Sequence, residues 1–243
     1  MRSGSEDRSG SDPIGAAGRP AGRAAAPRRI GTYKTYPNPL ARVELPTPAQ
    51  AGGMPLWQAL HERSSIRDFG PEPLTTPQLS QILWASQGIT RERGEWQFRT
   101  APSAGGLYPI ETYVATNRVD GLVGGLYHYE VRYHRLALLR EDPLIGMALT
   151  RAAMGQTMCQ RAAVVIIWTA VVARSARKYG ERAHRYIHMD AGHVAQNVYL
   201  AATALELGGC VIGAFFDDEI NLVLELDGRE ETSIYMAAIG RRG

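Results

Sequence analysis

The chain has 243 residues, of which 44% are hydrophobic and 21% charged, as in an ordinary globular protein with one main core. The formal net charge of +3 lies in residues 1–30, which hold six Arg and three acidic residues and leave 21 basic and 21 acidic residues for the rest. The remainder therefore lacks the basic balance of a nucleic-acid-binding domain, and we expect no nucleic-acid partner.

The cysteines and the apolar runs of the sequence indicate the cellular compartment. Cys159 and Cys210 form no CxxC pair, which favours two buried free thiols in a reducing environment. The longest apolar run, residues 162–173, is too short to span a bilayer. Arg28-Arg29 could begin a twin-arginine signal, but polar residues 31–34 follow where an apolar region should start. We therefore expect a cytoplasmic protein with no membrane partner.

Composition divides the chain into three parts. Residues 1–30 consist mainly of Gly, Ser, Ala, Pro and Arg, which cannot bury enough apolar surface to fold, so a disordered tail is predicted. Residues 31–53 contain several prolines and are expected to run extended over the domain surface. Residues 54–243 form the folded domain.

Helical patterns recur along the domain. Residues 75–88 illustrate the signals, because Thr75 precedes a first-turn Pro77 and Gly88 closes the segment. Helices are predicted at 54–63, 75–88, 143–158 and 182–207, with Gly208-Gly209 ending the last, and a short one begins at Asp217.

Strand patterns lie between these helices. Residues 163–172 form a continuous β-branched run, which is typical of a strand buried on both faces. Strands are predicted at 110–116, in a hairpin over 126–139 that turns at 132–134, and at 163–172, 210–215 and 234–239. The order predicts an α+β domain whose central sheet is flanked by helices on both faces.

A dense group of donors follows the first predicted helix, in Arg63-Ser64-Ser65-Ile66-Arg67. Guanidinium groups meet phosphate oxygens two at a time, and serine hydroxyls fill the remaining lone pairs. The alternative is an exposed helix end, where basic residues complement the helix dipole.

The segment Pro102-Ser103-Ala104-Gly105-Gly106-Leu107-Tyr108-Pro109 has small residues that would let a flat ligand approach the backbone. The alternative is a glycine-rich turn that leads into a strand. Together with the phosphate-type donors, this segment favours a phosphorylated aromatic cofactor.

These two clusters resemble the FMN-binding signature of the nitroreductase superfamily, and within it the SagB-type, or azoline, dehydrogenases. Three further stretches support the resemblance: Lys178-Tyr179-Gly180, residues 190–197 and Ile239-Gly240-Arg241. The resemblance covers about residues 33–243. It implies a nitroreductase-like fold with a mainly antiparallel sheet, an FMN cofactor and a homodimer.

The resemblance also implies roles for individual residues. The arginines and serines of the first cluster would hold the FMN phosphate, with Arg67 near the pyrimidine edge of the flavin, where a positive charge stabilises its anionic reduced form. The second cluster would lie against FMN across the dimer interface. The implied cofactor-binding residues are Arg63, Ser64, Ser65, Arg67, Pro102, Ser103, Ala104, Gly105, Ile212, Gly213, Ala214 and Arg241.

Lys178 and Tyr179 match a Lys-Tyr motif of the SagB-type enzymes. Oxidation of an azoline removes a hydride from one carbon and a proton from its neighbour, and the flavin takes only the hydride. A lysine made less basic by burial, or a tyrosine near a cation, suits the role of proton acceptor. The alternative is a solvated surface pair, since lysine is rarely buried.

The region 184–197 contains three histidines. His184 and His188 share a helix face, but no HExxH motif or carboxylate triad accompanies them, so no metal is expected. We expect Gly192 to permit close helix packing, with polar contacts inside that packing from His193, Gln196 and Asn197.

Three functions remain open from the sequence. The first is a SagB-type dehydrogenase that oxidises an azoline or a similar C–N or C–C bond in a peptide-derived substrate. The second is an NAD(P)H-dependent reductase of nitro compounds or quinones, in which the nicotinamide would bind without a Rossmann domain, because no GxGxxG follows a strand. The third is a non-catalytic flavoprotein partner in a biosynthetic complex.

Overall fold

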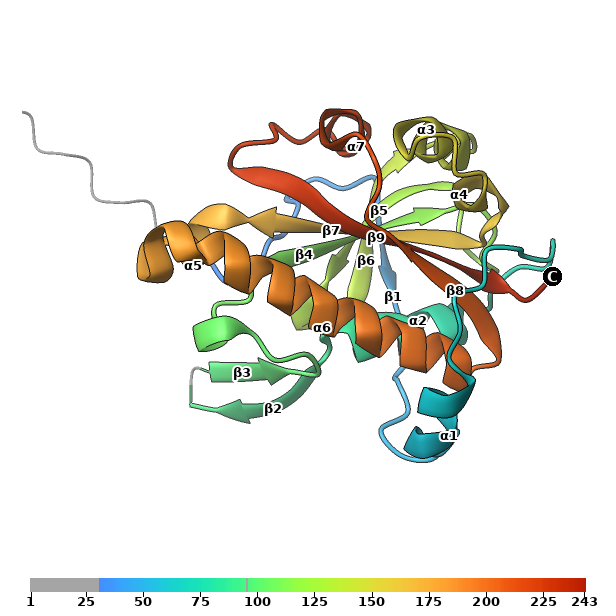
Figure 1. Ribbon diagram of the computed structural model, residues 1–243, viewed down its shortest axis with the longest axis horizontal. Helices are drawn as coiled ribbons and strands as arrows, with labels where there is room; N and C mark the ends of the chain where they lie inside the picture. Colours follow the sequence, from blue (N-terminus) through green and yellow to red (C-terminus); the bar gives the residue numbers. More distant parts are fainter. Residues whose placement is uncertain (1–30, 95) are drawn as a thin grey trace, which may run out of the picture.

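A computed structural model describes residues 31–94 and 96–243, so the predicted tail at residues 1–30 lies outside the described residues. A seven-stranded sheet, with every neighbouring pair antiparallel, forms the centre in the order β1-β6-β5-β4-β7-β9-β8 (Figure 1). Its strands are β1 Ala41–Glu44, β4 Ile110–Thr116, β5 Gly125–Glu130, β6 Arg135–Glu141, β7 Val164–Val171, β8 Leu207–Ile212 and β9 Glu231–Arg241. The predicted α+β class with an antiparallel sheet is confirmed.

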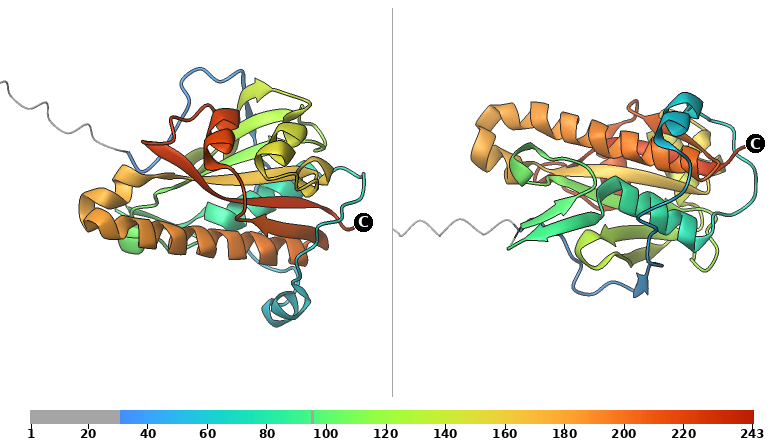
Figure 2. Two further views of the ribbon diagram at one scale, coloured as in Figure 1. Left: turned by 45° about the horizontal axis from the view of Figure 1, so that its top comes forward. Right: turned by 90° about the horizontal axis from the view of Figure 1, so that it is seen from below.

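Helices cover both faces of this sheet, as Figures 1 and 2 show. One apolar core includes buried residues of α2 and α6, and the second includes buried residues of α3, α4 and α7 on the other face. The helices are α1 Leu56–Glu62, α2 Thr76–Gln87, α3 Ile145–Ala152, α4 Met158–Arg161, α5 Val172–Tyr179, α6 Ala183–Ala204 and α7 Asp217–Leu224. Among the described residues, no helix is both long and apolar enough to cross a membrane.

Several elements predicted from local sequence patterns are confirmed by the structure. Thr75 caps α2, its side chain accepting from the Gln78 backbone N–H while the Gln78 side chain binds back to the Thr75 N–H. The predicted strand at 110–116 matches β4 in both bounds. The apolar run at 163–172 forms β7, which is buried along nearly its whole length at the sheet centre.

Two predictions about helix ends were wrong. The helix expected at 143–158 is broken into α3 and α4, because Met154 and Gly155 both adopt positive φ angles of 56° and 78°. Gly208-Gly209 does not end α6 but lies inside β8. A Cβ on Gly208 would come within 2.8 Å of Ile66 Cγ2, so glycine lets residue 66 pack directly on this strand.

Four elements had no counterpart among the predicted ones. Part of residues 31–53, here called the lead-in, forms β1 at the sheet edge, and β2 Ile89–Arg93 pairs with β3 Trp96–Arg99 in a separate two-stranded sheet. The fourth is α5, which directly follows β7 and carries the Lys-Tyr pair at its end. In Figure 1 this helix meets α6 at an elbow above the small sheet.

Candidate active site

The basic segment, residues 63–67, follows α1 and lies along β8. The Ile66 N–H donates to the Gly209 carbonyl at 2.9 Å. Ser65 Oγ lies 2.9 Å from Tyr199 Oη, which also accepts from the Val211 N–H at 3.0 Å. The Arg63 guanidinium lies 5.4 Å from the Tyr199 ring centre, a cation–π distance. Tyr199 of α6 therefore contacts two of the predicted phosphate-binding residues, Arg63 and Ser65, and binds the sheet at Val211.

Arg241 lies beside this segment. It is the last residue of β9, opposite Leu207 at the start of β8, and its carbonyl accepts from the Gly70 N–H at 3.1 Å. Ser64 and Arg67 are exposed on the same segment. The fold thus brings the backbone of the distant Arg241 close to the chain that follows the basic segment. Hydroxyl and guanidinium donors of this kind would suit a phosphate monoester.

Three further residues predicted to bind the cofactor, Ile212, Gly213 and Ala214, lie at the other end of β8. Ile212 is buried, whereas Gly213 and Ala214 are exposed just beyond it. The Ala214 carbonyl accepts from Gln156 Nε2 at 2.7 Å, which fixes the turn after the strand. These residues come one to three positions after Val211, whose N–H binds the same Tyr199 hydroxyl that contacts Ser65.

The loop of residues 102–108, here called the cofactor loop, is held by a buried carboxylate. Ser103 Oγ donates to Asp190 Oδ2 at 2.6 Å, and the Ala104 N–H donates to Asp190 Oδ1 at 3.1 Å. Burial raises the pKa of Asp190, and these hydrogen bonds oppose that rise. Ser103 Oγ also accepts from the Tyr108 N–H at 2.9 Å, which closes the loop on itself.

The Lys-Tyr pair meets this loop at Gly105. A Cβ on Gly105 would lie 2.6 Å from Tyr179 Oη and 2.7 Å from Lys178 Nζ, and Gly105 has a φ of +64°. Only glycine combines that backbone conformation with so close an approach. The fold therefore brings two separately predicted groups together. Lys178 is exposed in the single chain, however, so the burial invoked for a proton-accepting lysine is absent there.

The two clusters lie on different sides of α6. Asp190 holds the cofactor loop and Tyr199 holds the basic segment, nine residues further along the same helix. At 3.6 residues per turn, nine residues place these side chains on opposite sides of the helix axis and about 14 Å apart along it. One chain therefore does not bring its own cofactor loop and basic segment to one face.

The polar residues of α6 behave differently from the prediction. His193 and Gln196 are exposed, and a Cβ on Gly192 would meet open space, so these residues do not make the expected contacts within one chain. Asn197 does, because its amide donates to the Ala85 carbonyl at 3.0 Å. The sequence analysis assigned no role to Asp190. Asp190 could have been found as a carboxylate on the apolar face of the predicted helix, because a buried carboxylate requires a hydrogen-bond partner.

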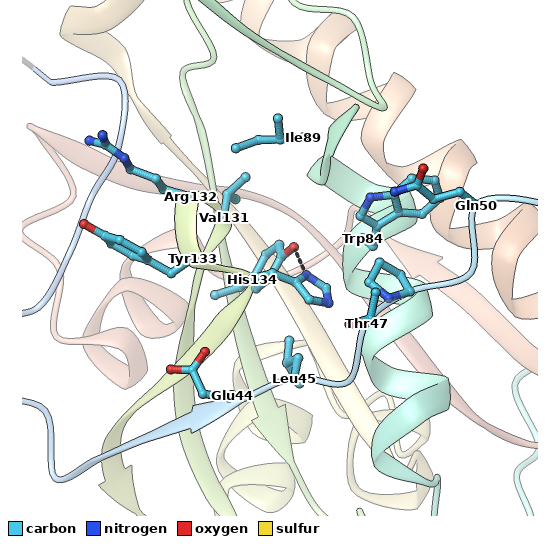
Figure 3. A pocket seen from close by; sticks show the side chains of 12 residues that line it. Glu44, Leu45, Thr47, Gln50, Trp84, Ile89, Val131, Arg132, Tyr133 and His134 are labelled. Atoms are coloured by element: carbon cyan, nitrogen blue, oxygen red, sulfur yellow. Dashed lines mark hydrogen bonds between the residues drawn. The ribbon is translucent and has the colours of Figure 1, made fainter. Parts of the chain in front are cut away.

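A cavity of about 340 Å³ lies elsewhere, between residues 44–50 and the β5–β6 turn (Figure 3). His134 at its wall accepts from or donates to Tyr129 Oη at 2.8 Å and Ser80 Oγ at 2.8 Å. Burial lowers the pKa of His134, which favours the neutral ring in this chain of hydrogen bonds. None of the predicted site residues lines this cavity.

Known proteins resemble the chain over most of its length. The family model described as "Nitroreductase family" matches residues 60–241. A nitroreductase-family protein of Methanocaldococcus jannaschii, MJ1384, is 41% identical over 187 residues, which cover 77% of this chain and 91% of that protein. The trifolitoxin-processing protein TfxB of Rhizobium leguminosarum bv. trifolii is 30% identical over 152 residues, covering 61% of this chain and 41% of TfxB.

Solved structures share the fold. A nitroreductase-family crystal structure from Ralstonia eutropha JMP134 has a TM-score of 0.71 and 30% identity, covering 87% of this chain and 98% of that one. A relative from Desulfovibrio desulfuricans, solved in complex with FMN, has a TM-score of 0.56 and 21% identity over 79% and 88% of the two chains. The matched residues include the basic segment, the cofactor loop, the Lys-Tyr pair and Arg241, and the chain belongs to the nitroreductase family of oxidoreductases.

Proposed function

We propose that the protein is an FMN-dependent dehydrogenase of the SagB type, which oxidises an azoline or a similar C–N or C–C bond in a peptide-derived substrate. The observation that carries this proposal is the approach of Lys178 and Tyr179 to Gly105 in the cofactor loop. That contact places two proton-handling groups beside the backbone that would face the flavin.

The donor chemistry fits FMN. The phosphate would be held by Arg63 and Ser65, which both contact Tyr199, together with the exposed Ser64 and Arg67 of the same segment. Arg241, at the end of β9, would complete this set. The flavin, when bound, supplies the acceptor for a hydride. The exposed Gly213-Ala214 turn presents backbone without bulky side chains to a flat ring.

Two copies of the chain complete the site in this proposal. Since the basic segment and the cofactor loop lie on opposite sides of α6, one cofactor would be held by the basic segment of one protomer and the cofactor loop of its partner. The apolar surface of α1 supports this arrangement, because Leu56, Trp57 and Leu60 are 57%, 79% and 43% exposed. They adjoin an apolar groove of about 590 Å³ between α1, α2 and α6.

Lys178 and Tyr179 would handle the proton that leaves the carbon next to the hydride donor. Lys178 Nζ lies 5.3 Å from the Tyr179 ring centre, so the ammonium or amine and the phenol act at one edge of the loop. One group of the pair can accept the proton from the substrate carbon, and the other can donate a hydrogen bond that stabilises the charge left on the substrate. Docking of substrate and of the second chain would supply the burial that the single chain lacks.

The peptide-derived substrate class is supported by TfxB, whose name describes the processing of a toxin. The reductase alternative is favoured by the exposure of Lys178. Anaerobic mixing separates the two. Bleaching of bound flavin by an azoline-containing peptide supports the dehydrogenase, whereas rapid bleaching by NADPH with no azoline turnover supports the reductase.

The first test concerns FMN retention. Arg63→Gln removes a charged donor to phosphate, and such hydrogen bonds contribute about 1.5–3 kcal/mol, so FMN should bind about 10- to 100-fold more weakly. The visible spectrum of the purified protein and flavin fluorescence titration measure this change. Arg229→Gln, at an exposed position outside both clusters, is the matched control. A colourless wild-type protein that takes up no added FMN would refute the proposed cofactor.

The second test concerns assembly. Trp57→Glu places a charge in the exposed apolar surface of α1 and should weaken self-association at least about 30-fold, as loss of a central interface anchor does. Sedimentation velocity should then show monomers that have also lost FMN. Leu222→Glu on α7, where Leu222 is 77% exposed, is the control and should remain dimeric. A W57E dimer with full FMN content would contradict the proposed interface.

A further inference from the structure

Arg174 is a buried arginine in the first turn of α5, only 3% exposed. All three of its guanidinium nitrogens are engaged. Nε donates to the Gly31 carbonyl at 2.8 Å, Nη1 donates to the Tyr108 carbonyl at 3.0 Å, and Nη2 pairs with Glu111 Oε1 at 2.6 Å. One side chain of α5 thus contacts the lead-in, the end of the cofactor loop and the start of β4.

Tyr108 is the far anchor of the cofactor loop. It has a φ of +46°, which a non-glycine residue adopts only when its surroundings hold it there. The Arg99 guanidinium stacks 4.5 Å from its ring centre, and the Arg99 N–H donates to Tyr108 Oη at 3.3 Å. Its own N–H binds Ser103 Oγ, so any shift of Tyr108 is transmitted to the start of the loop.

Lys178 lies four residues after Arg174, one turn further along the same helix. The position of α5 therefore determines where Lys178 and Tyr179 lie, and the position of Tyr108 determines where Gly105 lies in the loop. Arg174 belongs to α5 and donates to the Tyr108 carbonyl, so it links the helix to the loop directly. We propose that Arg174 is the positioning residue of the active site, which holds Lys178 and Tyr179 against the cofactor loop and uses the lead-in at Gly31 as its third support.

This inference rests on the proposed function, because it assumes that Lys178 and Tyr179 take part in the reaction. It gives the buried pair of Arg174 and Glu111 a purpose beyond stability. Replacement by well-packed apolar residues often stabilises a protein, so a buried ion pair is poor evidence of a stabilising role. The planar guanidinium binds three separate acceptors at once, and this fixes the relative positions of the segments that carry them.

The test is Arg174→Lys in the FMN-loaded full-length protein. Lysine keeps the positive charge for Glu111, but its single nitrogen cannot also reach the carbonyls of Tyr108 and Gly31. We expect kcat to fall on the order of 10- to 100-fold with KM and FMN content unchanged, because small displacements of a catalytic group have effects of this size. Arg151→Lys, at an exposed position on α3, is the matched control and should keep full activity.

A second readout does not depend on turnover. Lysine occurs at only two positions, 34 and 178. Lys34 is paired with Glu231 at 2.6 Å, so its slow acylation by an amine reagent is an internal reference. The rate of Lys178 acylation, followed by mass spectrometry, should change several-fold in R174K while that of Lys34 stays constant.

The triple variant R174K/K178A/Y179F decides how Arg174 acts. If it acts through Lys178 and Tyr179, the triple variant is no slower than K178A/Y179F. Losses that multiply, or an R174K protein that is slow only in proportion to lost FMN, would overturn the inference. A K178A/Y179F protein with full activity would refute both the proposed proton-handling pair and the inference. If K178A/Y179F is slow but R174K is as fast as the wild type, only the inference is refuted.

Glu111→Asp provides the same readouts should R174K yield too little folded protein. It draws the guanidinium toward the sheet without removing a charge, and the same slower kcat and altered Lys178 labelling are expected. Unchanged values for both would overturn the inference.

Discussion

Replacing Lys178 by alanine together with Tyr179 by phenylalanine is expected to slow oxidation of an azoline substrate about 10²- to 10⁴-fold, the usual contribution of a general acid–base group. FMN content and the fold should be retained, since Lys178 is exposed and Tyr179 keeps its ring. Single-turnover bleaching of the flavin under anaerobic conditions measures the loss. Both groups are predicted to act at the proton-removing step, so the substrate Kd should change little.

A matched control exists in the β5–β6 turn. Arg132 and Tyr133 are likewise an adjacent cation and tyrosine, both exposed and away from the cofactor loop. Arg132→Ala with Tyr133→Phe should leave the rate unchanged. If the Lys178 and Tyr179 variant bleaches as fast as the wild type, those residues do no chemistry, and the reductase becomes the better assignment.

Glu111→Gln is expected to cause the largest loss of stability, about 3–5 kcal/mol, because it leaves the buried Arg174 without its counter-charge. Thermal or urea unfolding measures the loss. Glu225→Gln is the control, since that carboxylate is 71% exposed and its ion pair with Arg140 should contribute at most about 1 kcal/mol. An E111Q protein as stable as E225Q would contradict the importance of this buried pair.

The Glu111 carboxylate should also make the stability of the protein depend on pH in the acid range. Burial raises the pKa of Glu111, but the charge of Arg174 and the hydrogen bond from His128 more than reverse this, and the pKa falls from 4.5 to about 2. Because the pKa is depressed in the folded state, the stabilisation is complete above about pH 4.5 and is lost as the pH falls toward 2. The shift corresponds to about 3 kcal/mol.

This contribution can be isolated by comparison. Asp190 acts with the opposite sign, because its folded-state pKa is raised, so its protonation partly offsets the loss. Asp190 is present in both wild type and E111Q, and the difference between their acid unfolding curves therefore reports Glu111. Parallel curves between pH 4.5 and 2 would show that the Glu111 pKa is not depressed.

The sequence predicted the fold well where local chemistry decides the outcome. The cap at Thr75 and the apolar run of β7 are local patterns that tertiary contacts did not override. The break after α3 was missed because Met154 takes a left-handed conformation that its residue type does not indicate. Gly208-Gly209 was misassigned because its reason, the packing of Ile66 from a distant segment, is not visible in sequence order.

The site was predicted in parts. Residue types identified the basic segment, the cofactor loop and the Lys-Tyr pair, because phosphate binding and close backbone approach demand particular side chains. Their supports could not be predicted in the same way. Asp190 and Tyr199 acquire their roles only when α6 turns one of them toward each cluster, and Arg174 acquires its role only where three distant carbonyl or carboxylate groups converge.

The position of β9 has a consequence for biosynthesis. This strand, at residues 231–241, lies between β7 and β8, so β7 has an unpaired edge and β8 has no partner in this sheet until residues 231–241 have been synthesised. β7 is strongly apolar, and an open apolar edge is where nascent chains associate wrongly. Completion of the sheet therefore waits for β9, and removal of this eleven-residue strand would separate β8 from the rest of the sheet rather than trim its border.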